Sequence, residues 1–565
     1  MKLGIDFGTC FSFMSTMIGT DVRTTLVDDA DKYSGIPTLF MHTKDPSVDY
    51  FGRSAFDRRM TFPNDYKKEI KKDIRMHPER ISLDATYTYP IGGKYYKAES
   101  IVEKFITYLV DTAKKNAKAQ GIPDSSVIDE ITITAPVGLN SDSNAMEATA
   151  LYNEMLIRVA KKVSGIKDDS RVHVLGEPVA AAMYNIHKNN SEGKQTILVY
   201  DLGGGTFDAA IVEYNPKGGT KGKFEAIATG GYTDVGGGDW DNCLKEIIKK
   251  KTNFSGIKIE GSGYVPENSK ERERFEQSIV EAKILLSKKT KALVDFNIGR
   301  TEYAETVSRE EFEQASRPFL EKTIKIVNDV LRTYEEQKDL ATGSGIKNID
   351  RIVLVGGASQ MPQVRNRLME VFPQFPATSI YLDEPQLAIA AGASINNNMP
   401  VRPRVLHTYG IGSNYTVDEA EYKAHKNDKY IDPDDGEEMT KYWIQEEDGV
   451  KEYKRRGVSN IIMKGATIDN GYAEASSTYS PLSDRQTKVG FNVYVSESSE
   501  DWSDYEKPSL FGYTVEIPSE FHGKATQYSI IAEFRITDDG VVILKTYEEK
   551  DGKRGKEIGH GRFPK

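Results

Sequence analysis

Hydrophobic residues follow different periods in the two parts of this chain. Between residues 1 and 395, short apolar runs such as 197–200 and 352–355 are typical of buried strands, whereas 98–118 carries apolar residues at helical spacing. Beyond residue 461, apolar and polar residues alternate, which is typical of antiparallel strands with one packed and one solvated face. The pattern therefore predicts an α/β part followed by a β-sandwich or half-barrel of about 100 residues.

The same pattern predicts the order of the elements. The expected strands are 1–7, 11–18, 131–136, 172–175, 197–200 and 352–355, followed by 489–495, 511–517, 529–536 and 541–547. The expected helices are 98–118, 151–163, 180–184, 270–289, 309–335 and 387–395. The charged run 61–80 is typical of a solvated helix face, and the polar stretch 410–457 is typical of a long loop or hairpin. Pro400 and Pro403 mark a stiff linker between the two parts.

Three glycines follow the strand predicted at 197–200. The glycines at 203–205 leave backbone N–H groups free to surround a phosphate, and Thr206 adds a hydroxyl donor. Two carboxylates flank the turn, Asp201 and Asp208, and they would repel a phosphate unless a cation stood between them. The stretch indicates a phosphate–Mg²⁺ site at a β-hairpin turn. An ordinary glycine-rich hairpin with solvated aspartates is the alternative.

A second turn of this kind lies near the N-terminus, where Asp6, Gly8 and Thr9 repeat the pattern. Two such turns suggest two related half-domains that face one nucleotide. The chain contains no GxxxxGK[ST] motif, which excludes a P-loop. A further glycine cluster at 236–238 is a candidate ligand contact, with an ordinary strand–helix turn as the alternative, and the glycine turn at 356–357 could receive the nucleoside end of the ligand.

Composition and charge narrow the class of protein. The chain has 565 residues and a net charge of −10, so it is long enough for several domains and is not expected to bind nucleic acid. Its two cysteines, Cys10 and Cys243, argue against a disulfide framework. We expect no leader peptide, no membrane span and a cytoplasmic location, because no apolar run approaches the roughly 20 residues that cross a bilayer.

These motifs, in this order, resemble those of the actin/sugar-kinase/chaperone ATPase superfamily, and most closely those of seventy-kilodalton heat-shock chaperones of the DnaK type. The matching segments are 5–9 and 200–208 for two phosphate loops, 355–359 for an adenosine loop and 177–182 for a further signature, with Val179 where the family has threonine. The resemblance is strong over 1–395 and weak over 405–560. In the weak part, 462–468 and 534–540 are similar to the family's peptide-binding β-domain.

The resemblance implies a two-lobed, actin-like (ribonuclease H-like) ATPase domain that binds ATP or ADP with Mg²⁺. It implies catalytic roles for Lys71, Glu177, Asp201, Thr206 and Asp208, with Asp6 and Asp201 holding the metal through waters. The implied nucleotide contacts are Asp6, Gly8, Thr9, Cys10, Phe11, Lys71, Gly203, Gly204, Gly205, Thr206, Gly236, Gly237, Lys283, Ser287, Gly356, Gly357, Ala358 and Gln360. Pro136 matches a family proline tied to an interdomain switch.

The chain departs from the family pattern in several places. Where the family stacks two arginines on the adenine, this sequence has Ile284 and Gln360, and Val280 stands where the family has a ribose-binding glutamate. The linker is basic and carries two prolines instead of being acidic and leucine-rich. Extra residues enter the β-domain near 415–457, and no helical lid is expected after the strands.

Together these features predict an atypical, lidless Hsp70-like chaperone that acts in protein folding or the stress response. We expect an ATPase domain at 1–397, a linker at 398–408 and a β-sandwich at 409–565 that binds unfolded or extended polypeptide. ATP turnover is expected to be slow, and a J-domain cochaperone and a nucleotide exchange factor are the implied partners. The alternatives are a nucleotide-regulated scaffold for one dedicated protein, a sugar-kinase-like phosphotransferase and an actin-like filament.

Overall fold

The computed structural model forms two compact units. It describes all residues except 19–20, 25–34, 83–84, 123–125, 138–142, 217–222, 233–234, 253–269, 299–300, 383, 397–404, 406, 448, 464–465, 467–471, 497–499, 506–507, 538–540 and 564–565. One unit comprises Met1–Leu139 and Leu151–Val401, and the other comprises Asn140–Ala150 and Arg402–Lys565. We call them the N-terminal and C-terminal units.

The first half of the N-terminal unit is built on a mixed sheet with the strand order β11-β10-β1-β2-β3. Its strands are β1 (Lys2–Asp6), β2 (Phe11–Ile18), β3 (Asp21–Thr24), β10 (Glu130–Ala135) and β11 (Val172–Gly176), and β4 (Ile36–Pro37) pairs with β2. Strand β1 runs antiparallel to β2 and parallel to β10. Helix α3 (Ala98–Ala119) and the later part of α4 (Ser143–Ser164) share a hydrophobic core with this sheet.

The second half repeats the same topology in the order β14-β13-β12-β17-β18. Its strands are β12 (Gln195–Leu202), β13 (Phe207–Asn215), β14 (Lys223–Tyr232), β17 (Arg351–Val355) and β18 (Ile380–Tyr381). Strand β12 runs antiparallel to β13 and parallel to β17, as β1 does with β2 and β10. Each half therefore places a hairpin turn beside the end of a parallel strand, where a glycine loop can form.

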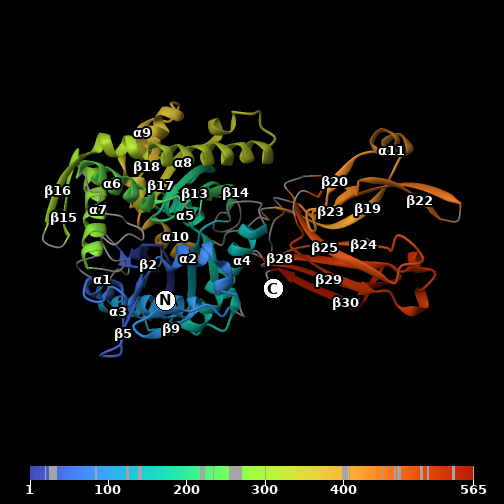
Figure 1. The fold of residues 1–565 in the computed structure, drawn as a ribbon, viewed down its shortest axis with the longest axis horizontal. Coiled ribbons are helices and arrows are strands. Elements are labelled where there is room, and N and C mark those ends of the chain that lie inside the picture. Colours follow the sequence, from blue (N-terminus) through green and yellow to red (C-terminus); the bar gives the residue numbers. More distant parts are fainter. Residues whose placement is uncertain are drawn as a thin grey trace. The chain divides into compact units, whose positions relative to one another are not determined.

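Helices α5 (Glu177–Lys188) and α10 (Ala388–Asn396) lie between the two sheets (Figure 1). Close packing requires glycine on both sides, because a Cβ at Gly392 would lie 1.8 Å from the Ala180 carbonyl oxygen and one at Gly4 would lie 2.5 Å from the Ala390 carbonyl oxygen. The two halves thus join through helix backbones without bulky side chains. This arrangement is the two-lobed, actin-like domain that the sequence predicted, so the predicted fold class is confirmed.

The remaining elements of the N-terminal unit are additions to one or the other of its two halves. On the first half they are β5 (Leu39–Thr43), β6 (Val48–Phe51), α1 (Gly52–Arg58), β7 (Tyr66–Lys68), α2 (Ile70–Met76), β8 (Tyr89–Ile91) and β9 (Lys94–Tyr96). On the second half they are α6 (Gly237–Lys251), α7 (Lys270–Lys288), β15 (Lys291–Ile298), β16 (Thr301–Ser308), α8 (Arg309–Gln337) and α9 (Pro362–Val371). Helix α8 starts at a capping box, in which the Ser308 hydroxyl and the Glu311 carboxylate each accept from the other's backbone N–H.

The C-terminal unit is a β-sandwich. One sheet has the order β22-β23-β19-β25-β27, with β26 paired to β23, and the other has the order β24-β28-β29-β30. The strands are β19 (Thr408–Val417), β22 (Tyr442–Glu447), β23 (Val450–Ile462), β24 (Tyr472–Tyr479), β25 (Lys488–Ser496), β26 (Trp502–Ser503), β27 (Phe511–Glu516), β28 (Ile530–Thr537), β29 (Val542–Lys550) and β30 (Lys553–Phe563). Alternate residues of both sheets, among them Phe491 and Phe534, form one core, as the alternating sequence pattern predicted.

At 410–457 the prediction of a long loop is wrong, whereas the alternative of a hairpin is partly confirmed, because β19 pairs antiparallel with β23 and β22 with β23. Residues 408–417 and 450–462 are long strands of the main sheet, and α11 (Glu419–His425), the hairpin β20 (Lys429–Ile431) and β21 (Glu438–Thr440), and β22 lie between them. Sequence reasoning missed these strands because charged residues at exposed alternate positions obscure the hydrophobic period. The predicted linker at 398–408 lies outside the described residues except for 405, 407 and 408. Among the helices that the structure describes, none is both long and apolar enough to cross a membrane.

Candidate active site

The glycine turn between β12 and β13 is the centre of the site. The Gly237 N–H donates to the Gly203 carbonyl oxygen at 2.9 Å, and the Gly238 N–H donates to that of Gly204 at 2.8 Å. A Cβ at Gly236 would lie 2.5 Å from the backbone of Gly205. The start of α6 therefore docks on this turn backbone to backbone, which only glycines permit.

The loop after β17 is fixed to the same strand. Gly356 has a φ of +81°, and a Cβ there would lie 2.3 Å from the Leu202 carbonyl oxygen and 2.6 Å from Asp201 Oδ1. The Ser359 hydroxyl accepts from the Leu202 N–H at 3.2 Å and donates to the Val355 carbonyl oxygen at 2.6 Å. These contacts place the Gly356–Gly357 turn beside the end of β12.

The hairpin turn between β1 and β2 meets the second turn from the other half. A Cβ at Gly204 would lie 2.6 Å from Cys10 Sγ, and one at Gly205 would lie 3.1 Å from Thr9 Cγ2. The turn itself needs glycine at position 8, because a Cβ there would lie 2.0 Å from the Phe11 carbonyl oxygen. The two phosphate-type turns predicted from the sequence thus face each other.

Four carboxylates are buried at this junction. Asp6 ends β1, Glu177 begins α5, and Asp201 and Asp208 are cross-strand partners in β12 and β13. Burial, together with the negative charge of Glu177, raises the pKa of Asp6 to about 7. Burial likewise raises the pKa of Asp208 to about 7 against the opposing charge of Arg75, and burial with three neighbouring carboxylates holds the pKa of Asp201 well above its ordinary value.

One ion pair crosses this junction, between Lys71 Nζ on α2 and Glu177 Oε1 at 2.5 Å. Lys71 is only 2 % exposed. Burial lowers the pKa of Lys71, but the negative charges around it, that of Glu177 above all, raise it by more, so the lysine stays charged. The site therefore holds one buried ion pair, Lys71–Glu177, beside three further buried carboxylates.

These residues fit a hydrated divalent cation with a phosphate group. Asp208 Oδ1 is buried and has no hydrogen-bond partner among the described residues, and an unsatisfied buried carboxylate oxygen is costly. No three His, Cys, Asp or Glu side chains in the described part of the chain gather closely enough to hold a metal directly. Coordination through waters, with backbone N–H groups left for the phosphate, is the mode that this donor set suits.

The structure brings most of the predicted site residues into this one cluster. Those tied to it by the contacts above or by position in its turns are Asp6, Gly8, Thr9, Cys10, Phe11, Lys71, Glu177, Asp201, Gly203, Gly204, Gly205, Thr206, Asp208, Gly236, Gly237, Gly356, Gly357 and Ala358. Lys283 joins them by donating to the Gly237 carbonyl oxygen at 2.9 Å and to Asp241 at 2.8 Å. The Ser287 hydroxyl donates instead to the Lys283 carbonyl oxygen of its own helix at 3.4 Å, and Gln360 is half-buried at the end of the third loop.

Sequence reasoning missed Arg75, Tyr152 and Asp241. The charged run 61–80 was expected to be a solvated helix face, but α2 buries both Lys71 and Arg75. Their spacing of four residues was the available signal, because residues i and i+4 share one face of a helix. Tyr152 and Asp241 approach the site only through tertiary packing, so no local pattern could reveal them.

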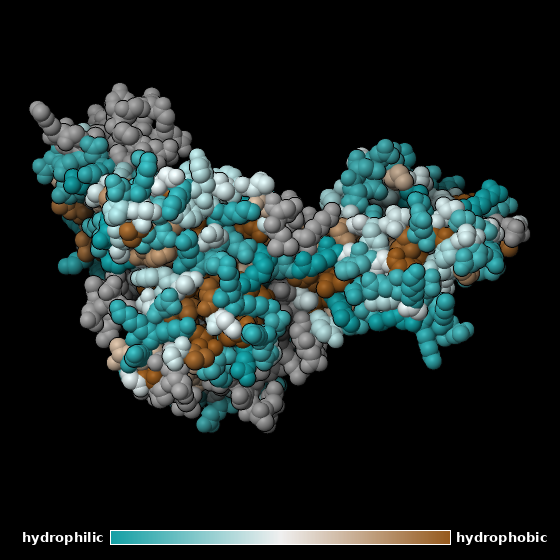
Figure 2. Space-filling model, turned by 90° about the horizontal axis from the view of Figure 1, so that it is seen from below, coloured by the Kyte–Doolittle hydropathy of each residue, from teal (hydrophilic) through white to brown (hydrophobic). Residues whose placement is uncertain are grey.

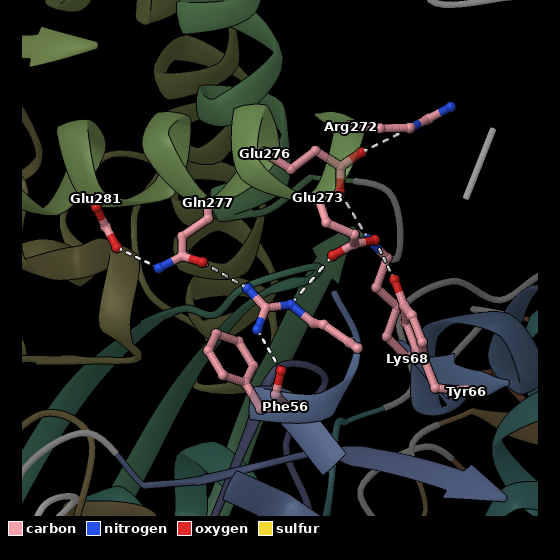
Figure 3. Close-up of polar contacts among 9 residues, drawn as sticks. Phe56, Tyr66, Lys68, Arg272, Glu273, Glu276, Gln277 and Glu281 are labelled. Carbon is pink, nitrogen blue, oxygen red and sulfur yellow. Dashed lines mark hydrogen bonds and ion pairs between the residues drawn. The ribbon is translucent and has the colours of Figure 1, made fainter. Parts of the chain in front are cut away.

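A set of polar contacts joins the two halves beside the site; we call it the clasp. Arg59, next to α1, donates from Nε to Glu273 at 3.2 Å and from Nη2 to Gln277 at 3.0 Å, both on α7. Tyr66 and Lys68 of β7 reach the same helix, where Tyr66 donates to Glu273 and Lys68 pairs with Glu276 at 2.8 Å (Figure 3). Arg59 and Glu273 are buried, so this clasp is more than a surface ion pair.

Two related halves with facing phosphate-type turns define the class of an actin-like ATPase domain, here followed by a β-sandwich. A family model described as Hsp70 protein matches residues 2–402, which is most of the chain. The chain belongs to the Hsp70 protein family, whose members bind and hydrolyse nucleotide. The family predicted from the glycine motifs is thus confirmed.

Individual relatives are similar at modest identity. The chain is 26 % identical over 417 residues to the chaperone protein HscA of Buchnera aphidicola, covering 71 % of this chain and 70 % of the relative. It is 27 % identical over 416 residues to the chaperone protein DnaK of Psychrobacter cryohalolentis and 30 % identical over 404 residues to that of Mycoplasma mobile. These matches cover 70 % of this chain but only 58 % and 57 % of the two DnaK proteins.

Weakening the clasp should speed nucleotide release. Replacing Glu273 with glutamine removes the charge that Arg59 and Lys68 face, and breaking a buried ion pair costs about 3–5 kcal/mol where one partner stays charged. We expect ADP to leave E273Q about tenfold to a hundredfold faster than it leaves the wild type, measured by chasing a fluorescent ADP analogue. The matched control is E103Q, which breaks the exposed pair with Lys162 and should change nothing. A wild-type release rate in E273Q would contradict a gating role for the clasp.

The stability of the nucleotide-free protein should depend on pH through the protonation of Asp208. Its pKa is about 7 in the folded protein and 3.8 ordinarily, so the folded state binds more protons than the unfolded state between these values. The contribution of Asp208 to stability is therefore present below pH 3.8 and is lost as the pH rises to about 7. We expect D208N to be more stable than the wild type at pH 8, with a gap that narrows as the pH falls toward 4.

Asp49 provides a control of opposite sign for this comparison. Despite partial burial, hydrogen bonds from Lys104 and His42 hold the pKa of Asp49 below its ordinary value. The wild type should therefore gain stability over D49N as the pH rises from acid. Thermal unfolding of both variants across the pH range measures the two trends, and a gap between D208N and the wild type that does not change with pH would contradict the assignment.

Proposed function

We propose that this protein is an Hsp70-like chaperone ATPase that hydrolyses ATP slowly and uses the nucleotide to regulate binding of polypeptide. The observation that carries the proposal is the meeting of three glycine loops around four buried carboxylates and the Lys71–Glu177 pair. A tri-anionic phosphate needs backbone donors and cations in one place. Lys71 would provide one positive charge and the loop N–H groups would provide the donors. A metal ion would balance the negative charge of the remaining carboxylates.

Each residue has a role in the proposed chemistry. Mg²⁺, when bound, would neutralise charge on the phosphates, and Asp6 and Asp201 would hold it through waters. Lys71 would stabilise the charge that develops as the terminal phosphoryl group leaves, and the Thr206 hydroxyl would donate to that group. Glu177 and Asp208 would orient water, and Glu177 also keeps Lys71 charged and in place.

The glycine loops would bind the nucleotide itself. The 203–205 turn would hold phosphates through backbone N–H groups, and the 356–358 loop would lie along the adenosine. Lys283 is held between the Gly237 carbonyl oxygen and Asp241, where it would reach the ribose. Tight packing of these loops supports the proposal because it leaves backbone groups, not side chains, to line the site.

We further propose a division of the chain into an ATPase domain at 1–397, a linker at 398–408 and a polypeptide-binding domain at 409–565. The exposed hydrophobic side chains of the C-terminal unit support the last assignment, and they are Ile431, Ile444, Val450 and Tyr472. On the face drawn in Figure 2, hydrophobic side chains reach the surface only in small separate patches. Extended, partly apolar segments would suit such a surface, with a J-domain cochaperone and an exchange factor as further partners in the cytoplasm.

A nucleotide-regulated scaffold for one dedicated protein is the second candidate. It is favoured by the residues between β19 and β23, which fold as α11, β20, β21 and β22 and expose Ile431 and Ile444. A surface built from dedicated elements suits one partner better than many unrelated peptides. The two candidates differ in whether unfolded peptides change ATP turnover.

The test is ATP turnover by the full chain with and without a panel of unfolded apolar peptides. The chaperone proposal predicts slow turnover that stops when EDTA removes Mg²⁺ and rises when peptide is added. Parallel binding measurements give the affinity and the dissociation rate of each peptide. Turnover that no peptide changes, together with no peptide binding up to high micromolar concentrations, would favour the scaffold.

A further inference from the structure

A serine, a histidine and an aspartate meet at the turn between β5 and β6. His42 and Asp49 are cross-strand partners in this hairpin, and Ser47 lies in the turn that joins its strands. Asp49 Oδ1 lies 2.6 Å from His42 Nδ1, and Ser47 Oγ lies 3.4 Å from His42 Nε2. The imidazole therefore bridges a carboxylate and a hydroxyl through its two different nitrogens. The nucleotide site described above uses none of these residues.

The carboxylate decides which imidazole nitrogen carries the proton. Ionised Asp49 can only accept, so neutral His42 carries its proton on Nδ1 and donates it to Asp49. Nε2 is then left with a lone pair that faces the Ser47 hydroxyl. Despite partial burial, hydrogen bonds from Lys104 and His42 hold the pKa of Asp49 below its ordinary value, so the carboxylate stays ionised at neutral pH. This is the arrangement in which a histidine can take a proton from a serine hydroxyl.

Packing holds the imidazole in this orientation. His42 is 3 % exposed, and its ring centroid lies 5.8 Å from that of Tyr96. The glycine turn between β8 and β9 also covers it, because a Cβ at Gly92 would lie 1.8 Å from the His42 carbonyl oxygen and 3.1 Å from His42 Cδ2. The Thr43 hydroxyl donates to the Pro46 carbonyl oxygen at 2.6 Å and so fixes the turn that carries the serine. A base that is fixed in place before the reaction loses little freedom when it takes a proton.

The serine is open to solvent and has a lysine beside it. Ser47 is exposed, whereas His42 is buried behind it. Lys94 Nζ on β9 donates to Ser47 Oγ at 3.1 Å. Lys44 runs along the same glycine turn, since a Cβ at Gly93 would lie 3.5 Å from Lys44 Cδ. A histidine–aspartate pair that only held the hairpin would need neither a serine at its second nitrogen nor a cation on that serine.

We propose that Ser47, His42 and Asp49 form a nucleophilic triad that takes the acyl group of small carboxylic esters, with a preference for acyl groups that carry a negative charge. The exposed hydroxyl can reach a small ester directly from solvent. The ammonium group of Lys94 would favour an anionic acyl group and would donate to the carbonyl oxygen as that oxygen becomes negative.

The reaction needs no further reagent than the ester and water. Ser47 Oγ attacks the carbonyl carbon while its proton passes to His42 Nε2. The bond between the carbonyl carbon and the leaving oxygen then breaks, and the leaving oxygen takes the proton from Nε2. Water, deprotonated by the same nitrogen, attacks the acyl group and releases the carboxylic acid and the free serine. Asp49 is a positioning residue that orients the imidazole and balances its charge.

Acylation of the full chain by p-nitrophenyl acetate and by mono-p-nitrophenyl succinate tests the proposal. Release of nitrophenolate gives the rate, and mass spectrometry of peptides gives the acylated residue. Hydroxylamine cleaves an ester on serine but leaves an amide on lysine, so it separates Ser47 from the nearby lysines. We expect Ser47 to react at least about a hundredfold faster than other exposed serines, because general base catalysis contributes about 10²–10⁴-fold. The succinate ester, which carries a negative charge, should react faster than the acetate.

Variants of the triad separate its members. S47A should lose this reaction and keep the ATP turnover of the wild type. H42Q should lose about a hundredfold in rate, because glutamine cannot take the proton. D49N should react at least about tenfold more slowly with KM for the ester within about threefold of the wild type, because its amide favours the wrong tautomer.

Two further variants test the lysine and provide a control. K94M should lose the preference for the succinate ester. S54A is the matched control, because the exposed Ser54 hydroxyl accepts from Arg58 at 2.9 Å, as Ser47 accepts from Lys94, but contacts no histidine among the described residues. It should acylate at Ser47 like the wild type.

Other outcomes overturn the proposal. If Ser47 is acylated no faster than Ser54, the histidine and aspartate only hold the hairpin. A wild-type rate at Ser47 in H42Q has the same meaning, and should H42Q not fold, D49N decides. Equal rates for the two esters, or an unchanged preference in K94M, contradict the role of the lysine.

Discussion

Replacing Lys71 with alanine should abolish ATP turnover while leaving nucleotide bound. In the proposed function the lysine stabilises charge on the leaving phosphoryl group, and removing one such preorganised group costs about a hundredfold to a thousandfold in kcat. Nucleotide should stay bound because the glycine loops, which we propose carry most of its contacts, do not depend on Lys71. Single-turnover hydrolysis and ADP titration measure the two effects separately.

The structure shows how to separate this chemical effect from instability. Removing Lys71 alone leaves the Glu177 carboxylate buried without its partner, and breaking a buried pair in this way costs about 3–5 kcal/mol. The double variant K71M/E177Q removes both charges and should recover much of this stability without recovering turnover. K104A, which removes a half-exposed lysine paired with Asp49, is the control for loss of charge. Turnover like that of the wild type in K71A would show that Lys71 is not the catalytic lysine.

The glycine loops could be predicted because their requirements are local. A turn that brings backbone N–H groups together needs glycine at fixed offsets from a strand, and 203–205 and 356–357 meet this condition in the sequence alone. Repetition of Asp6 and Gly8 in the second turn also predicted two related halves, and the duplicated strand order confirms them. In these segments, local sequence and tertiary structure require the same residues.

The clasp and the buried charges could not be predicted, since they depend on contacts between distant segments. Arg59 and Glu273 are more than two hundred residues apart, and each is an ordinary charged residue in its own helical segment. Arg75 lies in a charged run whose composition is typical of a solvated helix, and only tertiary contacts of α2, such as that of Lys71 with Glu177 on α5, reverse that expectation. A prediction from the hydrophobic period fails where a functional site buries charged side chains, because the pattern assigns such residues to the surface.

The buried polar groups of the site lower the stability of the nucleotide-free protein. Three carboxylates with raised pKa values and unsatisfied atoms on Asp208, Arg75 and Tyr152 all destabilise the nucleotide-free protein. A metal and a phosphate would satisfy them together, so ligand binding and stability should be strongly linked. The glycine loops and the helices α5 and α10 supply the rigid packing that tolerates this strain.

Restoring arginines at the base pocket should tighten ATP binding and sharpen its selectivity. By the resemblance of the sequence, Ile284 and Gln360 stand where the family stacks arginines on adenine, and Ile284 is 51 % exposed on α7 next to Lys283. A guanidinium stacked on an aromatic base is worth about 0.5–2 kcal/mol. We therefore expect I284R/Q360R to bind ATP about tenfold to a thousandfold more tightly than the wild type, with a larger preference over GTP.

A matched control lies one residue along the same helix. Leu285 is 38 % exposed, and a step of one residue turns a side chain by about 100° around the helix, so L285R adds the same charge on a different face. If general electrostatic attraction to the triphosphate were the cause, L285R would tighten binding of ATP and GTP as much as I284R does. Calorimetric titration of both nucleotides into the wild type, I284R, L285R and the double variant distinguishes the two causes. A wild type that already binds ATP tightly and rejects GTP would show that Ile284 packs on the adenine as well as an arginine does, and the expected gain would then disappear.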